Sequence, residues 1–129
     1  MTHTLSELQA MTDEELTEVC ATVVMEWRKD NNFDDEAVSY WTDGWIAKEN
    51  VGDWTPLTDW NHTMQVVEKM QEGKEYHNLY WNKTENGYRC FVILHGVGIF
   101  QRDRDINVTD SSAQRAICIA AILASQAIQ

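Results

Sequence analysis

Four histidines are the side chains in this sequence best suited to acid or base chemistry at neutral pH. Their spacing is not typical of paired metal ligands; they are His3, His62, His77 and His95. His95 precedes Gly96 at the end of an expected strand, so it is the one candidate for a general acid or base. No serine or cysteine has a recognisable catalytic partner. We therefore expect a protein that is not an enzyme.

Metal and phosphate motifs are also incomplete. The three cysteines, Cys20, Cys90 and Cys118, lie among apolar residues without a CxxC pair, which predicts buried, reduced thiols and no zinc site. The aspartates that begin at Asp30 lack the central glycine of a calcium loop, and Trp41 stands where the loop needs glutamate. The segment Gly96-Val97-Gly98 lacks the lysine of a phosphate loop. No cofactor or metal is expected.

Two helices must support any site in the first half of the chain. Thr12 and Glu15 form a capping box, and the apolar residues after it recur at helical spacing, which predicts a helix from Asp13 to Trp27. Thr58 or Asp59 is the expected N-cap of the second helix. That helix places four residues on one face, namely Trp60, Met64, Val67 and Gln71.

A hairpin and a last helix follow. Asn86-Gly87 predicts a type I′ turn between two strands. In the second strand, alternation separates Tyr88, Cys90, Val92 and Leu94 from Arg89, Phe91, Ile93 and His95. A third strand is expected over Ile99–Arg102. Ser111 is the expected cap of the last helix, whose small-residue face suits close approach to a sheet or to a second copy; it comprises Ile117, Ala121, Ala124 and Ile128.

The segment between the first two helices has no clear period. Acidic residues alternate irregularly with aromatic ones from Phe33 to Trp54, which fits either a cover over the core or a stacking platform for a base. The whole pattern predicts one α+β domain over residues 1–129. We expect a mainly antiparallel sheet of three or four strands packed with three helices, in the order α-α-β-β-β-α, and self-association.

The charge is unevenly distributed. Residues 1–54 carry 13 acidic and 3 basic side chains, whereas residues 55–129 carry 8 and 7, which together give the net charge of −11. Nucleic-acid binding depends on clustered lysine and arginine, so it is not expected. Three interpretations of this uneven charge remain. The acidic half could serve solubility alone, or it could imitate nucleic acid for a basic partner. Alternatively, the nearly neutral half could bind a small anion.

The start of the chain has neither a basic segment nor the apolar segment of a signal peptide, and no apolar run is long enough to cross a bilayer. We therefore expect a cytoplasmic protein that does not contact membranes.

Several motifs together resemble a known family. Trp-Thr-Pro-Leu-Thr-Asp-Trp from Trp54, Val-Val-Glu-Lys-Met from Val66, the hairpin, and Ala-Ile-Cys-Ile-Ala-Ala-Ile-Leu from Ala116 are similar to the small bacteriophage proteins of the phage ABA sandwich domain type. One position departs from the family pattern, since Ile119 stands where the pattern has arginine. Arg115, one helical turn earlier, could replace that arginine.

The resemblance implies an accessory phage protein that acts in the host cytoplasm against host defence. Phage proteins of this size include ones that sequester cyclic-nucleotide or ADP-ribose signals without cleaving them. Such a protein needs arginines for phosphates and an aromatic face for the base. The chain could supply Arg89, Arg102, Arg104 and Arg115 with Trp81, Tyr80 or Phe100. The alternative for the arginines is an ordinary solvated role.

Two functions therefore remain as hypotheses. In the first, the protein binds a small nucleotide signal of the host immune system. In the second, the acidic half, including Asp34, Asp35 and Glu36, imitates nucleic acid and inhibits a host nuclease or effector protein.

Overall fold

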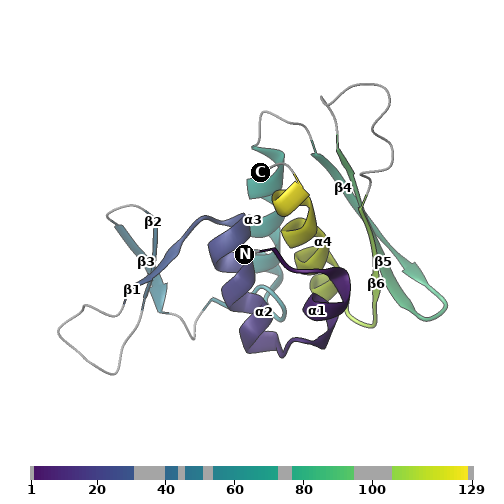
Figure 1. The fold of residues 1–129 in the computed structure, drawn as a ribbon, viewed down its shortest axis with the longest axis horizontal. Coiled ribbons are helices and arrows are strands. Elements are labelled where there is room, and N and C mark those ends of the chain that lie inside the picture. Colours follow the sequence, from purple (N-terminus) through teal and green to yellow (C-terminus); the bar gives the residue numbers. More distant parts are fainter. Residues whose placement is uncertain are drawn as a thin grey trace.

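Helices and two separate three-stranded sheets make up the described part of this computed structural model, residues 2–30, 40–43, 46–50, 54–72, 77–94 and 106–127 (Figure 1). The helical elements are α1 (Leu5–Ala10), α2 (Asp13–Val19), the π-helical turn η1 (Cys20–Val24), α3 (Trp60–Gln71) and α4 (Ala113–Ala127). The strands are β1 (Arg28–Asp30), β2 (Tyr40–Asp43), β3 (Ile46–Asn50), β4 (His77–Thr84), β5 (Gly87–Leu94) and β6 (Ile106–Asp110). This α+β architecture confirms the predicted fold class.

Helix α4 is the centre of the fold. It packs against β5 and β6 on one side and against α3 and η1 on the other (Figure 1). Every residue from Ala116 to Ile122 is fully buried, as expected for a helix that is apolar on all sides. The predicted small-residue face therefore lies in the interior as far as it is described, at Ile117, Ala121 and Ala124, and it packs within this chain.

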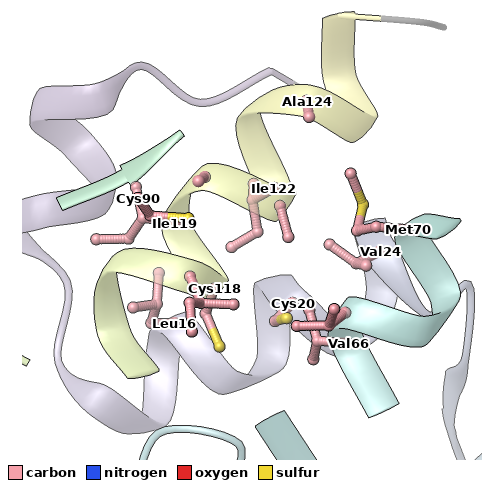
Figure 2. Packing of buried hydrophobic residues seen from close by; sticks show 14 of the residues in the cluster. Leu16, Cys20, Val24, Val66, Met70, Cys90, Cys118, Ile119, Ile122 and Ala124 are labelled. Atoms are coloured by element: carbon pink, nitrogen blue, oxygen red, sulfur yellow. The ribbon is translucent and has the colours of Figure 1, made fainter. Parts of the chain in front are cut away.

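The core fills the space between α4 and its neighbours. Figure 2 shows Cys20 and Val24 from η1 with Val66 and Met70 from α3, opposite Cys118 and Ile122 of α4. Cysteine and alanine side chains are small, so they allow the three helical segments to approach closely. Removal of this apolar surface from water is the main force that fixes the helices around α4.

The N-terminal helices start at matching caps. Thr12 and Glu15 form the predicted capping box of α2, and Thr4 and Glu7 form a second one that starts α1. The prediction missed α1, although it has the same Thr-x-x-Glu signature. The expected helix from Asp13 to Trp27 was too long, because α2 continues only as η1, which ends at Val24 with Met25 as its C-cap. Glu26, the next residue, has a φ of 60°, which is outside the helical region.

Two further predictions about helices need correction. Asp59 is the N-cap of α3, as expected, but the buried face of α3 is Thr63, Val66, Val67 and Met70, while Trp60 and Met64 are exposed. At α4, Ser112 and not Ser111 is the capping hydroxyl, since its Oγ accepts from the backbone N–H of Arg115 at 3.3 Å.

The second sheet has the strand order β4-β5-β6 and is antiparallel throughout. Glu85 and Asn86 form the turn between β4 and β5, and Gly87 has a φ of 139° while neither turn residue has a positive φ. The turn is therefore not type I′, which needs positive φ at both central residues. A Cβ at Gly87 would lie 2.4 Å from the backbone oxygen of Asp110, so glycine is needed here for close strand approach.

Several predictions fall partly or wholly outside the described residues. The expected third strand, Ile99–Arg102, is one of them, and the described third strand is β6. The irregular segment from Phe33 to Trp54 contains β2, β3 and Trp54, and Trp54 is fully buried against Trp27 with ring centroids 4.9 Å apart. At Trp54, the core-cover interpretation is therefore correct.

Candidate functional site

The face of the second sheet that points away from α4 carries the candidate site. Strand register aligns Trp81, Cys90 and Val108, and the latter two are fully buried on the α4 side. Paired residues share a face and successive residues alternate, so the neighbouring rows point the other way. We call this surface the outer face, and it consists of Tyr80, Phe91 and Asn107 in one row and Asn82, Arg89 and Thr109 in the next.

The outer face combines a cation with aromatic rings. The guanidinium carbon of Arg89 lies 4.2 Å from the centroid of the Phe91 ring, a cation–π contact. The Nε–H of Arg89 donates to Oδ1 of Asn107 at 3.0 Å. Tyr80, the cross-strand neighbour of Phe91, is 53% exposed. The ring and the amide together fix the direction of the guanidinium on an otherwise open surface.

This arrangement has a specific chemical capacity. An exposed tyrosine ring offers a surface on which a planar base can stack, and an arginine fork can donate to phosphate oxygens. Nucleic-acid-binding sheets use the same principle, with aromatic side chains on adjacent strands that stack bases. Asn82, Asn107 and Thr109 are exposed polar residues around the ring and the cation, so they can supply hydrogen bonds to a ligand.

The predicted ligand residues that the structure describes, Arg89, Trp81 and Arg115, do not gather in one place. Trp81 lies on the opposite face of the sheet from Arg89, and its ring stacks on Trp60 of α3 with centroids 6.2 Å apart. These two predicted residues therefore cannot line one pocket. Arg102, Arg104 and Phe100 lie outside the described residues, as does His95.

Arg115 is occupied by contacts within the protein. Its guanidinium contacts two carboxylates, those of Asp13 at 2.6 Å and Asp110 at 3.5 Å. It also donates to the backbone carbonyls of Leu8, Gln9 and Met11. The side chain is only 15% exposed, so Arg115 fastens α1 and the start of α2 to α4 and β6. Arg115 therefore does not have the ordinary solvated role that the sequence left open for the arginines.

The thiols and histidines show no reactive arrangement in the described part of the chain. All three cysteines are free and buried, as predicted. Burial raises the pKa of Cys90 to about 12, and the hydrogen-bonded Cys20 thiol raises the pKa of Cys118, so both stay protonated at neutral pH. Nδ1 of His62 accepts from the backbone N–H of Thr55 at 2.9 Å. No cluster of three or more metal-binding side chains occurs among these residues.

Three residues near the candidate site were not predicted as site residues. Phe91 and Asn107 lie on the outer face, and Trp60 stacks on Trp81 on the opposite face. A sequence signal existed for Phe91, because alternation in β5 places it on the same face as Arg89. The position of Asn107 beside Arg89 follows from the pairing of β5 with β6, and local sequence patterns do not predict the register of that pairing. Trp60 depends on the packing of α3 against β4.

A buried central helix, with helices on one side and a three-stranded antiparallel sheet on the other, defines a small α+β sandwich domain. The chain belongs to the phage ABA sandwich domain family, whose pattern matches residues 18–122. The family places it among bacteriophage proteins, in agreement with the resemblance found in the sequence.

A solved structure supports the same fold. A phage protein from Bacillus cereus ATCC 14579 superposes with a TM-score of 0.56 and 16% sequence identity, over 89% of this chain and 93% of that chain. No curated protein matches the sequence. None of the described helices is both long and apolar enough to cross a membrane.

Proposed function

We propose that this phage-family protein antagonises host antiviral defence by binding and withholding a small nucleotide signal, of the cyclic-nucleotide or ADP-ribose type, without cleaving it. The observation that carries the proposal is the pair formed by Arg89 and Phe91 beside the exposed Tyr80 on the outer face. A base would stack on Tyr80, and a phosphate would accept from Arg89.

The charge distribution supports a small ligand over a long nucleic acid. The net charge of −11 opposes the approach of an extended phosphate backbone. A small anion needs only one or two directed cations, and Phe91 and Asn107 hold Arg89 in a fixed direction. A directed arginine loses less conformational entropy when it binds than a mobile one.

The absence of catalysis is part of the proposal. The buried thiols of Cys90 and Cys118 have raised pKa values, which makes them poor nucleophiles. A ligand on the outer face would meet hydroxyl, amide, aromatic and guanidinium groups, and these bind a nucleotide better than they hydrolyse it.

Inhibition of a basic host protein by the acidic half is the second candidate. Three of the five acidic residues of α1 and α2 already have local roles, because Glu7 and Glu15 complete capping boxes and Asp13 pairs with Arg115. Asp34, Asp35 and Glu36 lie outside the described residues. The outer face therefore carries the stronger argument.

The test is ligand capture. The purified protein is incubated with lysate from cells whose nucleotide-based defence has been triggered, repurified, heated, and the released material is identified by mass spectrometry. An intact nucleotide from the wild type, lost in Arg89→Gln but retained in Lys83→Gln, is the expected result. A chemically altered nucleotide would indicate an enzyme. An empty wild-type protein would favour a protein target.

A further inference from the structure

Exposed apolar side chains gather at β4 and at the neighbouring helix α3. Among the described residues, the large hydrophobic side chains that remain exposed are Trp60, Met64, Tyr80 and Trp81. Tyr80 and Trp81 belong to β4, and Trp60 of α3 stacks on Trp81. Met64 lies one helical turn after Trp60 on the same side of α3. Trp60, Met64 and Trp81 therefore form an apolar patch on the α4 side, and Tyr80 is exposed on the outer face of the same strand. Exposed apolar side chains concentrated in this way indicate an interaction surface.

The same strand is an edge of its sheet. Within the described strands, β4 pairs with β5 alone, through all eight of its residues. The other edge, β6, has five residues, and the Gln9 side chain of α1 donates to its Thr109 carbonyl. Natural proteins protect long edge strands with proline, bulges or charges, but β4 has no proline and has Lys83 as its one lysine. A regular edge of this length, with three apolar or aromatic residues at its centre, is suited to pair with another strand.

The sequence of β4 specifies which strand fits. Asn78-Leu79-Tyr80-Trp81-Asn82 reads polar, apolar, aromatic, apolar, polar in either direction. When two such strands pair antiparallel about Tyr80, Leu79 stands opposite the second copy's Trp81, and Asn78 stands opposite its Asn82. This self-complementarity is what a two-fold symmetric interface requires.

We propose that two copies of this chain pair through their β4 strands, antiparallel, with the two-fold axis at Tyr80. The two sheets then form one sheet of six strands. On the α4 side, the Trp60–Trp81 pair of each copy lies beside the two-fold axis. Association of the two copies therefore covers the exposed indole rings. On the outer face, the two Tyr80 rings become neighbours. The proposal does not depend on the ligand proposed above.

Cysteine cross-linking tests the register directly. Residues directly opposite in an antiparallel pair have Cα atoms about 4.5–5.5 Å apart, within the range of a disulfide. Tyr80→Cys should therefore cross-link to the same residue of the second copy under mild oxidation by copper(II) phenanthroline. Two copper(II) complexes take up one electron each, and the two thiols release two protons. Asn82→Cys is the matched control, because its two copies would be roughly 13 Å apart at about 3.3 Å per residue. The native thiols are buried and should not interfere.

Mass measurement in solution tests the association itself. Light scattering after size exclusion should give twice the chain mass of 14.9 kDa for the wild type. Trp81→Lys should weaken association at least tenfold, whereas Thr109→Lys on the opposite edge strand should not. A wild-type monomer at every concentration tested, or equal cross-linking of Tyr80→Cys and Asn82→Cys, would overturn the proposal.

Discussion

Arg115 Nη1 lies 2.6 Å from Asp13 Oδ1, although 102 residues separate the two in sequence. The contact joins the first turn of α2 to the first turn of α4. The same guanidinium also reaches Asp110 and three backbone carbonyls between Leu8 and Met11. A single side chain thus holds together the N-terminal helices, the central helix and the end of β6.

Replacement of Arg115 should therefore destabilise the protein strongly. Arg115→Met leaves the Asp110 carboxylate and the three carbonyls without this donor, and we expect a loss of about 2–4 kcal/mol in the free energy of unfolding. Asp13 is 67% exposed, so Asp13→Asn should cost less than about 1 kcal/mol. Urea unfolding measures both values. A cost for Arg115→Met as small as that for Asp13→Asn would show that the contacts do not fasten the helices.

Gly87 should not tolerate a side chain. Its φ of 139° is strained for any other residue, and a Cβ would lie 2.4 Å from the Asp110 carbonyl oxygen. Gly87→Ala should lower stability by about 2 kcal/mol or more. Asn86→Ala, in the same turn but at negative φ, is the control and should cost about 0.5 kcal/mol. Thermal melts of the two variants should differ clearly, and overlapping melts would refute the close approach of β5 and β6.

Glu26 offers the opposite case, a position where glycine should help. Its φ of 60° costs a residue with a side chain about 1 kcal/mol, and its ion pair with Lys69 is long, at 3.9 Å, and exposed. We expect Glu26→Gly to stabilise the fold by about 0.5–1 kcal/mol. Glu26→Gln keeps the strain and removes the charge, so its unfolding midpoint in urea should match the wild type. A destabilised Glu26→Gly variant would contradict the assigned backbone conformation.

The buried thiols predict how stability depends on alkaline pH. The pKa of Cys90 is raised from 9.0 to about 12, and the pKa of Cys118 is also raised. A raised pKa in the folded state means that the stabilisation is complete below pH 9 and is lost as pH rises toward 12, because the unfolded thiols ionise first. Each thiol can contribute up to about 1.4 kcal/mol per pH unit.

Cys90→Ala checks this pH dependence. The variant should lose less stability than the wild type between pH 9 and pH 11, although it is less stable at pH 7 because of the cavity that it creates. Urea unfolding at several pH values gives the two slopes. Parallel slopes would mean that folding does not raise the pKa of Cys90.

Local sequence signals predicted the helices α2, α3 and α4 and the hairpin of β4 and β5, but not the sheet β1-β2-β3 or the strand β6. The Thr12 capping box, the Asp59 cap and the alternation along β5 are all short-range patterns, and each is present in the structure. Helix α1 was missed because six residues are too few to show apolar periodicity, even though its capping box is complete. The turn type was wrong because Asn86-Gly87 occupies the second turn position and the first strand position.

Tertiary relationships explain the remaining differences. Trp60 and Met64 were expected on the same face as Val67, but α3 packs mainly through Val66, Val67 and Met70. Which stripe of an amphipathic helix is buried depends on its partner, here α4 and η1. Arg89 pairs with Asn82, so Trp81, the residue before Asn82, points to the other face of the sheet. Composition cannot reveal this register between β4 and β5.

The most direct test of the central claim is to map where a nucleotide binds by NMR. A panel of cyclic dinucleotides, cyclic trinucleotides and cyclic ADP-ribose is titrated into isotope-labelled protein, and backbone, aromatic and indole signals are followed. The proposed function predicts that one member shifts the signals of Tyr80, Arg89 and Phe91 and leaves the Trp54 indole, buried on the other side of α4, unchanged. Saturable binding that shifts other residues and survives Arg89→Gln would contradict it.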